Sequence, residues 1–292
     1  MANGRKLSRR DFLRLLRVGA IDLGLLAAGG AVWGFLLEPN WVKIEHVNLK
    51  LPRLTPEFFG VRIVQVSDIH MGGWMNTERL QRIADLVVEQ NPDLLLLTGD
   101  FLVGHNFDKD SEQHLQDLIN ILAPLAKSIP SFGILGNHDY WTNAGAVRVM
   151  LKSSGIMELN NSVFTMSRGN ENLHLCGLDD IWEGHARLEN VISKLKDDSA
   201  AILLAHEPDF ADISAETGRF DLQISGHSHG GQVVFPFYGP PILPYLGQKY
   251  HTGLYQVGSM LQYTNRGVGM AGLPVRFNCP PEITVFTLNG DG

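Results

Sequence analysis

Five apolar runs of the sequence end in side chains that bind metal ions or carry protons. The candidates are aspartates, histidines and one asparagine: Asp68, His70, Asp100, Asn137, His138, His206, His227 and His229. Aspartate supplies an anionic oxygen, neutral imidazole supplies a nitrogen, and asparagine adds a carbonyl oxygen without further charge. This mixed set indicates divalent transition-metal ions, such as Mn, Fe or Zn, rather than Ca²⁺.

The spacing within the runs favours a common centre. Asp68 and His70 are two positions apart, as are His227 and His229, so in an extended segment both members of a pair point to the same side. A glycine directly precedes the candidate ligands of three runs and allows a sharp turn there. A single histidine or Gly-Asp pair after a strand is ordinarily structural, so the prediction depends on the whole set.

Alternating strands and helices must position these residues. Strands are predicted at 61–68, 93–100 and 132–139, and amphipathic helices at 77–90, 112–126 and 144–153 follow them in turn. Further strands are predicted at 162–166, 172–178 and 282–288, a helix at 188–196, and apolar runs at 200–208 and 221–231. The alternation predicts an α/β domain over residues 41–292, in which the carboxyl ends of the strands bring distant ligands to one rim.

The order D-x-H, GD, GNHD, H, GH-x-H resembles the calcineurin-like metallophosphoesterase superfamily, with every element present. The resemblance implies a four-layer α/β/β/α sandwich and hydrolysis of phosphate mono- or diesters by metal-activated hydroxide. One metal would be held by Asp68, His70, Asp100 and His229, and the other by Asn137, His206, His227 and a bridging Asp100. His138 would protonate the leaving group, oriented by Asp139. The segments HEPD, SGHSHGGQ, FYGP and PEITVFTL look like exported bacterial phosphoesterases of the YkuE/YaeI type.

Residues 1–40 have the composition of an export signal or a membrane anchor. Six basic residues occupy positions 1–17, and the almost entirely apolar positions 18–37 are long enough to span a bilayer. Ser8–Leu13 resembles the twin-arginine signal, which implies the twin-arginine export machinery as a partner. No clear cleavage site follows, which favours a retained anchor at the inner membrane with the domain outside the cytoplasm. The alternatives are an exported protein and a buried amphipathic helix.

Composition excludes some classes of function. The formal net charge is −7, and no internal run of Lys or Arg forms a basic stripe, so nucleic-acid binding is not expected. Cys176 and Cys279 fit neither a zinc ribbon nor a disulfide scaffold, and two buried free thiols are expected.

Arg266 and Arg276 are either solvated or in contact with phosphate. The apolar segment 233–247 is either a stiff loop packed on the core or a wall that faces a lipid substrate or the membrane.

Two other functions stay open at this point. A lipid phosphodiesterase that cleaves the pyrophosphate of UDP-2,3-diacylglucosamine would require a cytoplasmic site, which the export signal contradicts. A non-catalytic binding protein on the same fold would not require the complete ligand set. The favoured prediction is therefore a membrane-anchored enzyme that acts on a phosphate-ester substrate.

Overall fold

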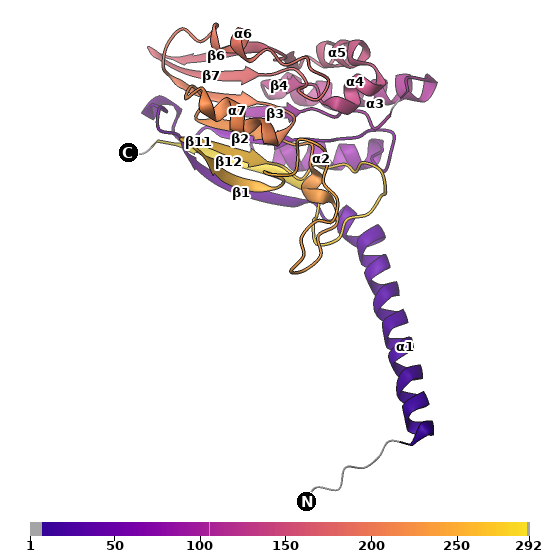
Figure 1. Cartoon of the computed structure of the whole chain (residues 1–292). Helices are drawn as coiled ribbons and strands as arrows, with labels where there is room; N and C mark the ends of the chain where they lie inside the picture. The colour runs from indigo at the N-terminus through magenta and orange to yellow at the C-terminus, as the bar shows by residue number, and fades with distance from the viewer. Residues whose placement is uncertain (1–7, 105, 291–292) are drawn as a thin grey trace, which may run out of the picture.

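Two six-stranded β-sheets pack face to face (Figure 1). The structure is a computed structural model that describes residues 8–104 and 106–290, so Arg5 and Lys6 of the predicted signal lie outside the described residues. The first sheet has the spatial order β1 (Lys43–Lys50), β12 (Glu282–Asn289), β2 (Arg62–Val66), β3 (Leu94–Thr98), β4 (Ser131–Ile134) and β5 (Met157–Glu158). The second has the order β10 (Gly253–Val257), β11 (Met260–Thr264), β9 (Leu222–Ser225), β8 (Ala200–Leu204), β7 (Glu171–Gly177) and β6 (Ser162–Arg168).

Helices connect most of the parallel strands. They are α1 (Arg9–Val32), α2 (Thr77–Glu89), α3 (Lys109–Ser128), α4 (Asn137–Thr142), α5 (Ala144–Ser153), α6 (Leu188–Ile192) and α7 (Ala211–Glu216), with short helical turns at Trp33–Leu37, Glu38–Asn40, Pro56–Phe58, Pro208–Phe210 and His229–Gly231. Strands β2 to β5 are parallel, and so are β7, β8, β9 and β11. The carboxyl ends of each parallel set therefore share one edge of their sheet.

Alternation along the strands decides which side chains fill each layer. Leu94 and Leu96 of β3 pack between the two sheets, whereas Leu95 and Leu97 face α2, α3 and α5, because successive strand side chains point to opposite faces. A third cluster joins Leu203 of β8 to α6 and α7. Three apolar interfaces thus separate four layers, and the predicted α/β/β/α sandwich is confirmed.

Several predicted strands are shorter than expected, and this places the candidate ligands in loops. The strand predicted at 132–139 ends at Ile134, because Gly136 caps the amino end of α4. The runs at 200–208 and 221–231 end as strands at Leu204 and Ser225. The predicted helix at 188–196 ends at Ile192. Strands β1, β5, β10 and β11 were not predicted, since β5 has only two residues and the exposed and buried positions along β1 and β10 follow no strong apolar alternation.

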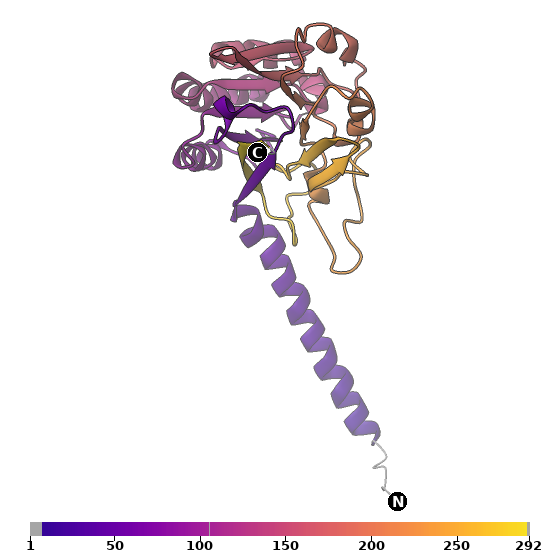
Figure 2. The same ribbon diagram turned by 90° about the vertical axis from the view of Figure 1, so that its left-hand side faces the viewer.

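The amino-terminal helix stands away from the sandwich in two perpendicular views (Figures 1 and 2). The continuous segment Phe12–Asn40 contains an 18-residue stretch with a mean hydropathy of 1.8 and is long and apolar enough to cross a membrane, by length and composition alone. A signal sequence has the same properties. The end of this segment is attached to the domain: Gly34 O accepts a hydrogen bond from Arg276 N at 2.9 Å, and the Glu38 carboxylate accepts one from Asn278 N at 2.8 Å.

Candidate metal centre

The carboxyl ends of five strands bring the proposed metal ligands to one edge of the sandwich. Asp68 and His70 follow β2, Asp100 follows β3, Asn137 follows β4, His206 follows β8, and His227 and His229 follow β9; each is at most 5% exposed. Asp68, His70, Asp100, His227 and His229 have φ angles between 50° and 70°. Residues with a side chain adopt this left-handed backbone at a cost of about 1–2 kcal/mol, and such strain clusters at functional sites.

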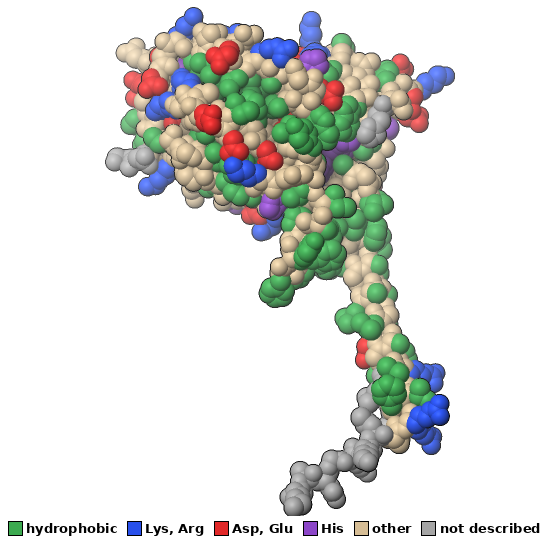
Figure 3. All heavy atoms as spheres, in the orientation of Figure 1, with side chains coloured by type: hydrophobic (Ala, Val, Ile, Leu, Met, Phe, Trp, Pro, Cys, Tyr) green, Lys and Arg blue, Asp and Glu red, His purple; other side chains and the backbone are tan. Residues whose placement is uncertain are grey.

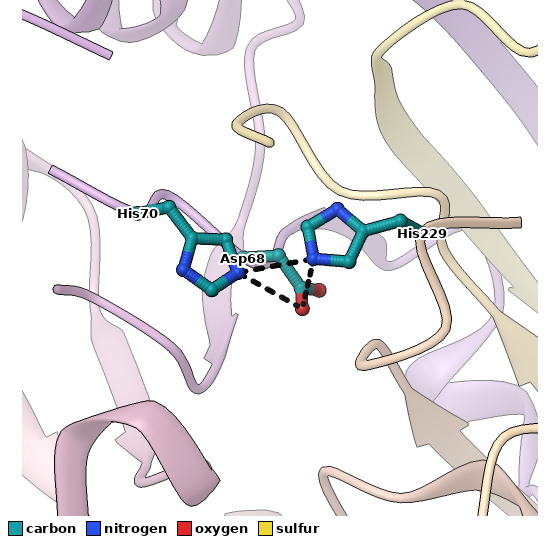
Figure 4. Close-up of side chains that lie close together, drawn as sticks. All are labelled: Asp68, His70 and His229. Atoms are coloured by element: carbon teal, nitrogen blue, oxygen red, sulfur yellow. Dashed lines mark hydrogen bonds and ion pairs between the residues drawn. The ribbon is translucent and has the colours of Figure 1, made fainter. Parts of the chain in front are cut away.

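The first cluster consists of Asp68, His70 and His229, whose side chains point toward one another (Figure 4). The Nε2 atoms of His70 and His229 are 3.0 Å apart, and His229 Nε2 lies 3.4 Å from Asp68 Oδ1. The potential ligand atoms of the three residues all lie within 4.8 Å of one another. One carboxylate and two imidazoles at this separation fit a single transition-metal ion.

The second cluster consists of Asp100, His206 and His227. His206 Nε2 lies 3.2 Å from Asp100 Oδ2, and the same carboxylate oxygen lies 3.6 Å from His70 Nε2 in the first cluster. Asp100 is thus located between the two clusters. A carboxylate in this position can bridge two cations.

Hydrogen bonds to backbone carbonyls leave suitable atoms of the second cluster open for a metal. His206 Nδ1 donates to Thr98 O at 2.6 Å, and His227 Nε2 donates to Tyr245 O at 2.8 Å. Such bonds fix the tautomer and the orientation of a ligating ring. Within the part of the chain that the structure describes, His206 Nε2, His227 Nδ1 and Asn137 Oδ1 are buried without a hydrogen-bond partner. Because an unsatisfied buried polar atom is costly, these three atoms fit a metal ion that they would bind together.

The electrostatics of the centre suit neutral imidazole ligands. Burial lowers the pKa of His70 to about 3 and lowers the pKa of His229 well below its usual value, because a charged ring loses its hydration. Burial opposes the charged form of His206 too, but the carboxylates of Asp100, Asp68 and Glu207 together outweigh it and raise the pKa of His206 well above its usual value. A metal at the second cluster must therefore compete with a proton for His206.

The family is decided by a comparison with protein-family models. The model described as calcineurin-like phosphoesterase matches residues 61–231, a range that begins just before β2 and contains all seven proposed ligands. The chain belongs to the calcineurin-like phosphoesterase family. The resemblance drawn from the motifs is thereby confirmed, and membership in this family of metallophosphoesterases indicates a hydrolase that uses divalent metals.

Curated relatives of this metallophosphoesterase extend the similarity beyond the metal-binding motifs. It is 38% identical to the metallophosphoesterase YkuE of Bacillus subtilis over 288 residues, which cover 97% of this chain and 98% of YkuE. It is 30% identical to the phosphodiesterase YaeI of Escherichia coli over 286 residues, covering 97% of this chain and 99% of YaeI. A transmembrane protein with a metallophosphoesterase domain from Danio rerio is 31% identical, and the match covers 90% of this chain and 61% of that protein.

The predicted proton donor His138 lies beside the proposed metal ligands. Its ring is half-buried, its centroid is 4.7 Å from that of His70, and one ring nitrogen lies within 4.8 Å of the ligand atoms of His70 and Asp100. His138 Nδ1 donates to Val103 O at 3.2 Å. This backbone carbonyl holds one nitrogen of the ring in place.

Asp139, predicted to orient His138, is completely buried and accepts several backbone hydrogen bonds. Its carboxylate accepts hydrogen bonds from the backbone N–H groups of Asp100, Phe101, Leu102 and Gly136, at 2.8–3.3 Å. That Asp139 orients His138 stays a prediction. Asp139 holds the loops after β3 and β4 together, and therefore positions Asp100.

We expect Asp139→Ala to destabilise the fold by about 3 kcal/mol or more, because four buried donors lose their acceptor and each such loss is costly. Urea unfolding of the purified protein measures the effect. The matched control is Asp212→Ala, which removes a partly exposed carboxylate paired with Lys249 and should cost less than about 1 kcal/mol. Equal destabilisation by the two substitutions would contradict the assigned role.

Gly136 lies where any side chain would collide with the ligands. A Cβ atom at this position would lie 2.6 Å from His206 Nε2 and in closer contact with Asp100 Oδ1. We expect Gly136→Ala to lose metal binding and about 1–3 kcal/mol of stability, the usual cost of overpacking a core. Metal analysis and thermal unfolding test this, with Gly145→Ala in α5 as the control, since its nearest contact would be at 3.3 Å. Full metal occupancy in both variants would refute the packing argument.

A cavity of about 540 Å³ opens beside the metal ligands of the phosphoesterase. Asp100, His138, His227 and His229 form its polar end, and Trp141, Trp182, Val233, Phe235, Ile242 and Leu273 form apolar walls. Sequence analysis did not identify the two tryptophans or Leu273, because no spacing relates them to the ligands. The Trp141 and Trp182 rings pack edge to face at 5.3 Å and form one wall.

The two arginines that were candidates for phosphate contact have structural roles instead. Arg276 is completely buried and donates to the carbonyl oxygens of Arg266, Gly267, Gly269 and Cys279. Arg266 forms ion pairs with Glu45 and Glu282. Neither the solvated nor the phosphate-binding alternative is correct. The prediction of two buried free cysteines is confirmed.

Proposed function

We propose that this chain hydrolyses phosphate mono- or diesters at a centre of two divalent transition-metal ions, Mn, Fe or Zn. The observation that carries the proposal is the position of Asp100, whose Oδ2 lies 3.6 Å from His70 Nε2 in one cluster and 3.2 Å from His206 Nε2 in the other. A shared carboxylate between two clusters is what a binuclear centre requires. Similarity to the phosphodiesterase YaeI supports a diester substrate.

The proposed ligands divide into two sets that share Asp100. One metal would be held by Asp68, His70, His229 and Asp100, and the other by Asn137, His206, His227 and Asp100. When bound, the cations would activate a water molecule and neutralise the charge that develops on the phosphoryl oxygens. The chain's own contribution is to hold the ligands in a buried site, where electrostatic stabilisation is strong, and to supply a proton.

His138 is the proposed proton donor. Its ring lies next to both clusters, and its Nδ1 is fixed by Val103 O, so the other nitrogen is the one that can carry a proton to the departing oxygen. A positioned general acid contributes about 10²–10⁴ to the rate.

Metal analysis combined with two chromogenic esters tests the proposal. The full-length chain should contain two transition-metal ions and should hydrolyse bis-p-nitrophenyl phosphate or p-nitrophenyl phosphate. Preference for the first ester would identify a diesterase. A metal-loaded protein that hydrolyses neither ester would refute the catalytic proposal and favour the second candidate, a binding protein on the same fold; the complete set of buried ligands argues against that candidate.

We also propose that residues 1–40 form a retained membrane anchor and residues 41–292 one phosphoesterase domain outside the cytoplasm. The apolar helix and the basic residues that precede it support this arrangement, with a cleaved signal and an exported enzyme as the alternative.

Export should fail when both Arg9 and Arg10 are replaced by lysine. Protease access in spheroplasts separates the two sides of the membrane, and a protected domain would favour a cytoplasmic lipid pyrophosphatase.

A further inference from the structure

Residues 233–247 are here called the apolar loop, and the tip of this loop is exposed rather than packed on the core. The side chain of Phe237 is fully exposed, and those of Tyr238, Ile242 and Tyr245 are 60–78% exposed. The loop contains no charged residue. The prediction of a loop packed on the core is therefore wrong for its tip, and a contiguous apolar surface of this kind indicates an interaction site.

The conformation of the loop tip also suggests a partner outside the chain. Phe235 N donates to Gly239 O at 3.1 Å, and Gly239 N donates to Phe235 O at 2.9 Å, which closes a tight turn. Phe237 occupies the left-handed region inside this turn, with φ 66°. This conformation is costly for a bulky residue, and no packing within the chain compensates a completely exposed side chain. Backbone strain of this kind is a reason to look for function.

Backbone pairing fixes the base of the apolar loop beside the end of α1. Val234 N donates to Phe277 O at 2.8 Å, and Phe277 N donates to Gln232 O at 2.9 Å. The preceding residue, Arg276, is bonded through its N–H to Gly34 O. Two perpendicular views show the loop descending from the domain on the side of α1, alongside its last turns (Figures 1 and 2).

The side chains around this junction are those of a membrane interface. Trp33 and Trp41 pack edge to face with centroids 6.1 Å apart, and they are 39% and 58% exposed. Tryptophan and tyrosine are enriched where a membrane meets water. The space-filling view shows hydrophobic side chains on the loop and on the adjacent part of α1, with Lys and Arg side chains gathered at the far end of the helix (Figure 3).

The apolar loop is continuous with the active-site cavity. Phe235 and Ile242 of the loop line the same cavity of about 540 Å³ as Asp100 and His138. A molecule whose phosphate reaches the metal ligands would therefore place its remaining part against an apolar wall, and that wall leads to the surface beside α1.

We propose that the apolar loop is a second membrane contact beside α1 and that the cavity accepts amphiphilic phosphate esters, whose apolar part stays in the membrane while the phosphate reaches the metal ligands. This inference deepens the proposed phosphoesterase function and relies on it for the substrate class. The membrane contact itself depends on the position and composition of the loop. Charge-free aromatic surface next to an apolar helix is suited to lipid.

A fluorescence experiment tests the membrane contact independently of activity. Full-length Phe237→Cys is labelled with an environment-sensitive dye and reconstituted into phosphatidylcholine vesicles; Cys176 and Cys279 are buried and should not react. We expect blue-shifted emission and quenching by lipids with brominated acyl chains. The matched control is Val149→Cys on α5, an apolar side chain that is 64% exposed. Equal behaviour of both sites would overturn the proposal. A blue shift that depends on the protein density and occurs without quenching by brominated lipids would also overturn it, because the loop would then contact a second copy or another protein.

A kinetic experiment tests the substrate class. Phe237→Asp should fold, since aspartate tolerates the left-handed backbone better than phenylalanine. It should lower kcat/KM for p-nitrophenyl hexadecyl phosphate in vesicles at least about tenfold, the effect of losing one buried aromatic side chain. Activity on soluble bis-p-nitrophenyl phosphate should stay within about twofold, and Val149→Asp should change neither. Equal effects on the two esters would overturn the proposal, whereas a wild-type protein that hydrolyses neither would refute the catalytic function alone.

Discussion

Replacement of Asp100 by asparagine should remove both metals and at least about 10²-fold of the activity, since even the loss of a residue that supports a ligand costs 10–100-fold. Asparagine preserves the shape of the side chain but removes the charge that faces His70 and His206 at 3.6 and 3.2 Å. Asp100 Oδ1 also accepts the backbone N–H of His138 at 2.9 Å. The substitution therefore acts on both metal sites and on the proton donor together.

Metal content and kcat/KM of the purified full-length protein measure this effect. Asp212→Asn is the matched control, because the same chemical change is made at a carboxylate that pairs with Lys249 at 2.7 Å on the surface. The control should retain two metals and ordinary activity. If Asp100→Asn loses only one metal, or retains both, Asp100 does not bridge the two clusters.

Replacement of His138 by alanine should retain both metals and lower kcat by about 10²–10⁴. The loss should be larger for an ester with an alkyl leaving group than for one with p-nitrophenolate, because p-nitrophenolate departs without protonation. We expect this difference between the two esters because the His138 ring lies close to the proposed ligands, with its centroid 4.7 Å from that of His70. His138 itself belongs to neither of the two proposed ligand sets.

His185→Ala is the control for the loss of an imidazole, since His185 stacks on Tyr140 with ring centroids 4.4 Å apart and does not line the cavity. It should leave both esters unaffected. Activity of His138→Ala close to that of the wild type on an alkyl ester would refute the role of His138 as proton donor. A loss of metal in that variant would instead make His138 a ligand.

The fold class and the convergence of the ligands were predictable because both depend on strong local patterns. The strands around Val64 and Leu96 are short apolar runs that end in ligands, and the carboxyl ends of parallel strands meet at one edge. The boundaries were less predictable. Gly136 lies inside the strand predicted at 132–139, but in the structure it caps the amino end of α4. Because it has no Cβ atom, its backbone can approach Asp100 and His206 closely. These two residues are distant from Gly136 in the sequence.

The roles that were not predicted depend on long-range contacts. The family resemblance assigned Asp139 to orient His138, whereas its hydrogen bonds to the backbone N–H groups of residues 100–102 were not predicted. Arg276 has no local sequence feature that predicts complete burial among four carbonyl groups. Side-chain hydrogen bonds between distant segments leave no periodic signal in a single sequence.

The sequence by itself determined the ligand types, their order and the family, because each motif carries its chemistry within a few residues. Only the tertiary structure decided which ring nitrogens are left for the proposed metals, through the bonds from His206 to Thr98 and from His227 to Tyr245. It also decided that the apolar loop lies exposed beside α1. Atom orientation and exposure depend on contacts between segments that are far apart along the chain, and those contacts exist only after folding.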